Sequence, residues 1–156
     1  MTLDVTVDPA VGTLLSAVLR RKLRTEVARM VRAAARTDGR PDLEVALLLT
    51  TDVAIRELNR DFRRQDKPTD VLAFAQREGP MGATHPSLLG DIVISVETAR
   101  RQARRGYYGE LIMLASHGLC HLLGYDHRDD AETSTMNARM AALRREAKRR
   151  GHVRAA

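Results

Sequence analysis

Residues 117–127 read HGLCHLLGYDH and carry three of the five histidines of the chain, spaced HxxxHxxxxxH at the end of a strongly apolar helical stretch. His117 and His121 are four residues apart, so on a helix they share one face, with Cβ atoms ~5–6 Å apart. Both can then reach one ion at the ~2.0–2.1 Å zinc–nitrogen distance. Gly124 can adopt the left-handed conformation that ends a helix, which brings His127 back toward the same ion. The stretch therefore predicts a metal site at the end of a helix.

The donor set of this site favours hydrolysis. Three neutral imidazoles without a protein carboxylate leave a fourth position for water, and zinc lowers the pKa of bound water to ~7. We expect one Zn²⁺ per chain. The spacing matches the metzincin protease signature HExxHxxGxxH at each histidine and at the glycine. Gly118 stands where those proteases carry their glutamate base, which disfavours a peptidase. Two alternatives to a catalytic zinc site are a closed structural zinc site and histidines that are hydrogen-bonded in the core.

Four other side chains near the motif or the strands have two interpretations each. Cys120 is a fourth ligand or a core residue, and we expect the core. Met136 recurs with Met140 at helical spacing, which favours the core over a metzincin-like Met-turn. Asp126 either orients a histidine or caps the turn. Asp91, at the start of an expected strand, either contacts the site or ends a turn.

Hydrophobic periodicity predicts strands and helices outside the motif. Alternating or short apolar runs indicate four strands, at 3–7, 43–49, 71–74 and 91–94. Helical spacing indicates helices over 15–34, over 52–62 with Thr51 as cap, from Ser95 to an interruption at Gly106, over 107–123 and over 130–150. A loop is expected at 79–87. Strands cluster early and helices late, which predicts an α+β fold with a small mixed four-stranded sheet. We expect one domain over 1–156, with a basic tail from about residue 144.

Composition favours a polyanionic partner in a reducing compartment. The net charge is +6 with 29% charged residues, which suits phosphate contacts, whereas 3% aromatic residues leave few rings for base stacking. Much of the excess charge lies in the basic tail, and such a run is more often a solvated helix face than a binding site. The single cysteine excludes a disulfide framework within the chain. No signal peptide and no apolar run near ~18 residues are recognised, so we expect a cytoplasmic protein without a membrane partner.

Three segments together resemble the YbeY family of metal-dependent endoribonucleases and ribosomal RNA maturation factors: HGLCHLLGYDH, residues 58–74 (LNRDFRRQDKPTDVLAF) and residues 89–95 (LGDIVIS). The resemblance spans roughly residues 45–143. It implies that His117, His121 and His127 bind zinc, and that Arg63 is an active-site arginine. Two positions depart from the family pattern, because Cys120 replaces an apolar residue and Phe62 stands where tyrosine is common.

The resemblance also implies a function. We expect a zinc-dependent, single-strand-specific endoribonuclease that matures the 3′ end of small-subunit ribosomal RNA and takes part in ribosome quality control. Arg63 and His117 are its expected catalytic residues, with Arg63 on the scissile phosphate. The expected partners are ribosomal RNA, the small ribosomal subunit and a ribosomal protein or GTPase. The alternative is a ribosome assembly factor with structural zinc and no significant nuclease activity.

Overall fold

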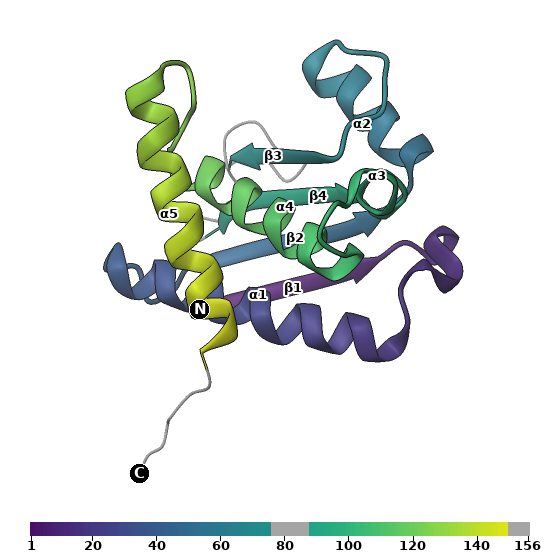
Figure 1. The fold of residues 1–156 in the computed structure, drawn as a ribbon. Helices are drawn as coiled ribbons and strands as arrows, with labels where there is room; N and C mark the ends of the chain where they lie inside the picture. Colours follow the sequence, from purple (N-terminus) through teal and green to yellow (C-terminus); the bar gives the residue numbers. More distant parts are fainter. Residues whose placement is uncertain (76–87, 150–156) are drawn as a thin grey trace.

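A mixed four-stranded sheet lies at the centre of the fold, in the order β1-β2-β4-β3 (Figure 1). The computed structural model describes residues 1–75 and 88–149, so the loop expected at 79–87 lies outside the described residues. The three parallel strands are β1 (Thr2–Val7), β2 (Glu44–Thr50) and β4 (Leu88–Ser95). The edge strand β3 (Val71–Ala75) runs antiparallel to β4. The predicted α+β class and mixed sheet are confirmed.

Helices cover both faces of this sheet. One face carries the larger core, which is covered by α1 (Ala17–Thr37), α4 (Tyr107–Leu122) and α5 (Asp130–Lys148), with the short α3 (Val96–Gln102) linking β4 to α4 (Figure 1). On the other face, α2 (Asp52–Arg63) buries Ile55 against Phe74 and Val93. No helix within the described ranges is both long and apolar enough to cross a membrane.

Side-chain caps set several helix starts. Thr51 and Ser95 are N-caps as predicted, because their hydroxyls accept the Ala54 and Thr98 N–H groups at 3.4 and 3.2 Å. The predicted start of the first long helix at residue 15 is wrong. Residues Pro9–Leu14 form a 3₁₀ helix, and Ser16 caps α1 by accepting the Leu19 N–H at 3.1 Å.

The predicted extent of the next helix is also wrong. α3 ends at Gln102 and does not reach Gly106, because Ala103 adopts an extended conformation (φ −61°, ψ 126°). Gly106 instead precedes the first residue of α4, with φ +100°, a conformation that favours glycine. The last helix ends at Lys148, two residues before the predicted end.

Gly118 allows α4 to approach β4 closely. A Cβ atom at Gly118 would lie 2.7 Å from Ile92 Cγ2, well inside van der Waals contact. The face of α4 that carries Gly118 is therefore packed on the sheet. This contact explains why glycine occupies the position of the protease glutamate, since a side chain there would meet the sheet.

Gly118→Ala should destabilise the fold by roughly 1–3 kcal/mol, because overpacking against Ile92 outweighs the ~1 kcal/mol gain in helix propensity. Gly109→Ala is the matched control on the same helix, since its Cβ would meet nothing within 4 Å. It should leave stability unchanged or raise it. Urea denaturation of both variants measures the difference, and an Ile92→Ala background should reduce it. Equal midpoints for the two alanine variants would contradict this packing.

Candidate metal centre

Three imidazole rings meet beside the C-terminal end of α4. His117 Nε2 lies 3.1 Å from His121 Nε2, and one ring nitrogen from each of His117, His121 and His127 lies within 4.8 Å of the others. Two nitrogens bound to one tetrahedral ion at ~2.05 Å lie about 3.3 Å apart, close to the spacing of the first pair. The predicted convergence of the three histidines is confirmed, and their role as ligands stays a prediction.

The turn after α4 brings the third ring back. Gly124 has φ +98°, as the prediction of a left-handed helix end required, and its N–H donates to the His121 carbonyl oxygen at 3.1 Å. The Tyr125 N–H donates to the Cys120 carbonyl oxygen at 3.0 Å. Asp126 Oδ1 accepts the His127 N–H at 2.8 Å and lies 3.9 Å from His127 Nδ1. Only the contact with the backbone N–H is within hydrogen-bond distance, so Asp126 caps the turn rather than orienting the His127 ring.

Burial keeps the two helical imidazoles in the form that binds metals. The pKa of His117 lies below its usual 6.5 because burial disfavours the charged ring, and repulsion from His121 and His127 adds to this. Burial is also the largest cause of the lowered pKa of His121. Neutral imidazole is the ligating form, so both side chains are suited to metal binding at neutral pH.

Arg63 lies in the same hollow as two of the histidines. It is the last residue of α2 rather than the first residue past it, because Arg64 adopts φ +59° and ends the helix. The Arg63 Nη2 donates to the Ala73 carbonyl oxygen at 2.8 Å, and the guanidinium carbon lies 5.1 Å from the centre of the Phe74 ring. The hollow of about 490 Å³ is lined by Arg63, Val71, Leu72, Ala73, Ala75, His117, His121, Gly124, Tyr125, Asp126 and Arg128.

Comparison with known proteins identifies the family. The family model described as Endoribonuclease YbeY matches residues 15–148. The chain belongs to the YbeY family. Endoribonuclease YbeY of Moorella thermoacetica is 47% identical over 134 residues, which cover 78% of this chain and 85% of the relative. The relative of the same name from Syntrophotalea carbinolica is 46% identical over 108 residues, which cover 66% and 72%.

A solved structure agrees with the fold. The solution structure of TM1509 from Thermotoga maritima aligns with a TM-score of 0.54 and 27% identity, covering 93% of this chain and 88% of that one. The likeness extends over nearly the whole length of both chains.

Three residues singled out from the sequence lie away from the hollow of this YbeY-family site. Cys120 and Met136 are buried in the main core, as expected. Asp91 is the fourth residue of β4 rather than its start. Since the neighbouring Ile92 packs on Gly118 of α4, Asp91 points to the opposite face of the sheet. Burial raises the pKa of the Asp91 carboxyl.

Arg128 was not predicted, although it also lines the hollow. Its guanidinium Nη2 lies 3.0 Å from Glu132 Oε2, and its Nε lies 3.6 Å from Asp126 Oδ2. The only signal in the sequence is a basic residue directly after the last histidine of the motif. Arg63 and Arg128 place two cationic side chains in the lining of the hollow.

Cys120 should resist alkylation in the folded protein. Burial raises the pKa of its thiol to about 11, so the thiol stays protonated at pH 8, and the thiolate is the reactive form. Iodoacetamide at pH 8 should leave the native chain unmodified and should label the urea-unfolded chain fully, as read by intact mass. Rapid labelling of the native chain would contradict a buried, protonated thiol.

Proposed function

We propose that this YbeY-family protein is a zinc-dependent, single-strand-specific endoribonuclease that matures the 3′ end of small-subunit ribosomal RNA and acts in ribosome quality control. The proposal is carried by the placement of Arg63 in one hollow with His117 and His121, beside His127. That arrangement pairs a phosphate-binding cation with a metal-binding cluster. Relatives that bear the name Endoribonuclease YbeY support RNA as the substrate.

The three imidazoles fit a zinc ion. Their ring nitrogens lie within 4.8 Å of one another, and burial favours the neutral form of His117 and His121. His117, His121 and His127 would hold the ion as an all-nitrogen donor set. When bound, zinc supplies Lewis acidity and lowers the pKa of a coordinated water to ~7. The hollow beside the histidines, with a volume of about 490 Å³, is large enough for a phosphodiester group.

Arg63 supplies phosphate recognition in this proposal. A guanidinium is a planar fork that can hold two phosphate oxygens at once. The hydrogen bond to the Ala73 carbonyl oxygen holds the group against the edge strand, and the contact with the Phe74 ring restrains it further. A group fixed in this way stabilises charge that develops on the scissile phosphate without reorganising during the reaction.

The wider setting of the proposal rests on the family, and the charge of the chain supports it. We propose ribosomal RNA and the small ribosomal subunit as partners, with a ribosomal protein or GTPase as a further partner, in the cytoplasm. A net charge of +6 favours binding to a polyanion. We further propose that residues 1–156 form one domain.

A cleavage assay tests this function. Purified protein loaded with one equivalent of zinc should cut a labelled single-stranded RNA internally and leave the matching duplex intact. Chelation should stop the cutting, and added zinc should restore it. If zinc binds and raises the melting temperature while the RNA stays intact, the proposal fails in favour of an assembly factor with structural zinc.

A further inference from the structure

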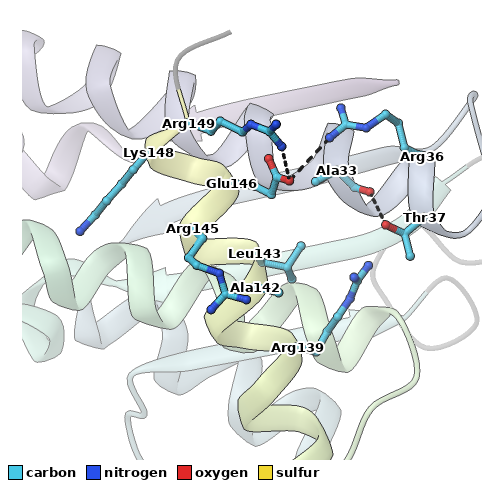
Figure 2. A pocket seen from close by; sticks show the side chains of 10 residues that line it. All are labelled: Ala33, Arg36, Thr37, Arg139, Ala142, Leu143, Arg145, Glu146, Lys148 and Arg149. Atoms are coloured by element: carbon cyan, nitrogen blue, oxygen red, sulfur yellow. Dashed lines mark hydrogen bonds and ion pairs between the residues drawn. The ribbon is translucent and has the colours of Figure 1, made fainter. Parts of the chain in front are cut away.

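A second hollow of about 490 Å³ lies between the C-terminal parts of α1 and α5, and we call it the α1/α5 groove (Figure 2). It shares no lining residue with the hollow beside the three histidines. Its lining residues are Ala33, Arg36, Thr37, Arg139, Ala142, Leu143, Arg145, Glu146, Lys148 and Arg149. The α1/α5 groove is therefore a site separate from the candidate metal centre.

The lining of the α1/α5 groove is strongly cationic. Four arginines and one lysine stand against a single carboxylate, Glu146. Arg149 Nη1 and Arg36 Nη2 lie 3.3 and 3.9 Å from the same Glu146 oxygen. Figure 2 shows one guanidinium group approaching it from α1 and the other from the residue that follows α5. Two arginines share Glu146, and the Asp38 carboxylate lies 3.9 Å from Arg139 Nη2, so two carboxylates face five cations and the groove keeps a net positive charge.

Arg139 is the least exposed of the cations that line the groove. Its side chain is only 16% exposed, and its Nε and Nη2 are buried without a hydrogen-bond partner among the described residues. The Asp38 carboxylate lies 3.9 Å from Nη2, beyond hydrogen-bond distance. A buried guanidinium without hydrogen bonds is unfavourable. The phosphate oxygens of a bound polyanion would accept hydrogen bonds from these two nitrogens.

Positive charge continues across α5 to the neighbouring surface. In Figure 2, Lys148 leaves α5 on the side away from Glu146, and the Arg145 side chain lies in front of the helix. Both also line a larger hollow in which the other charged residues are Lys22, Glu26, Arg104, Arg105, Glu110 and Arg144, so cations outnumber carboxylates there. A chain of regularly spaced negative charges can therefore follow this surface beyond the groove.

We propose that the α1/α5 groove binds the phosphodiester backbone of RNA, as a contact separate from the metal centre. This inference rests on the proposed function only for the identity of the polyanion as RNA. Guanidinium forks match phosphate oxygens, and arginine is the main cation of the groove. Anchors of protein interfaces are enriched in Trp and Tyr as well as Arg, whereas this groove is lined by arginines without an aromatic residue, and its apolar lining is limited to Ala33, Ala142 and Leu143. These features favour RNA over an acidic protein segment.

Binding of a labelled 30-nucleotide single-stranded RNA to the full chain, measured by anisotropy with chelator present to prevent cutting, tests the groove. Arg36→Gln/Arg149→Gln should weaken binding roughly tenfold and reduce the slope of log affinity against log salt by about 1.4, since each phosphate contact contributes about 0.7. Arg20→Gln/Arg24→Gln is the matched control on α1, removing the same charge from residues that line neither this groove nor the histidine hollow. It should change neither quantity appreciably.

Arg139→Met separates binding from folding. Removing a buried cation without hydrogen bonds should raise the melting temperature while weakening RNA binding. A purely structural Arg139 would lower the melting temperature and leave affinity unchanged, which would overturn its role.

Two other outcomes overturn the proposal. The first is that both double variants change the affinity for RNA by the same factor, or that neither changes it. The groove would then contribute nothing beyond the general charge of the chain. The other is arginine-dependent binding of a polyglutamate peptide as tight as that of RNA, which would assign the groove to acidic proteins. Groove-dependent RNA binding by a zinc-loaded protein that cuts no RNA would refute the proposed function and leave this inference standing.

Discussion

Replacing His117 by alanine should abolish RNA cleavage, with a fall of at least ~100-fold, because even loss of a group that only orients a metal ligand weakens binding or activity ~10–100-fold. His117 Nε2 lies 3.1 Å from His121 Nε2, so its loss removes half of the donor pair that α4 supplies. Zinc retained after dialysis, measured by elemental analysis, should fall together with the cleavage rate.

His152→Ala is the control, since it removes a histidine that lies outside the motif. It should keep both zinc and activity. Melting curves of the two variants without metal distinguish loss of zinc from loss of the fold. A His117→Ala protein that keeps one zinc and full activity would contradict the proposed ligand set.

Arg63→Ala should lower the cleavage rate by about 10²–10³-fold, the usual effect of removing one preorganised group that stabilises transition-state charge. The zinc content should stay unchanged, because Arg63 is not one of the proposed ligands and its guanidinium contacts the Ala73 carbonyl and the Phe74 ring. Single-turnover cleavage of RNA together with elemental analysis measures both quantities.

Arg60→Ala is the matched control on the same helix, because Arg60 pairs with Asp61 and does not line the hollow. It should cleave like the unchanged protein. Arg63→Lys should recover only part of the rate, since an ammonium keeps the charge but loses the fork. Equal rates for the two alanine variants would show that Arg63 is an ordinary surface residue.

The metal cluster could be predicted because its geometry is local. A spacing of four on a helix and a glycine at the helix end determine where three nearby rings point, and the structure confirms both features at His121 and Gly124. The buried position of Cys120 followed in the same way, since it lies on the face of α4 turned toward the core.

Features that depend on packing between distant segments could not be predicted. The place of Arg63 in the hollow requires α2 to lie against β3, and no local pattern reports that contact. Asp91 was ambiguous because the face to which a strand residue points depends on which side carries the helix. The burial of Arg139 arises where α5 crosses α1, and residues of both helices form the groove. The sequence alone shows only basic residues at helical spacing.

X-ray absorption spectroscopy of the zinc-loaded protein tests most directly whether three imidazoles share one ion. We predict a first shell of nitrogen and oxygen at ~2.0–2.1 Å, with the outer-shell scattering of three imidazole rings. Any zinc that His117→Ala still retains should show the outer-shell scattering of fewer imidazole rings. A sulfur shell at ~2.3 Å, or scattering from a single imidazole, would contradict the proposed site.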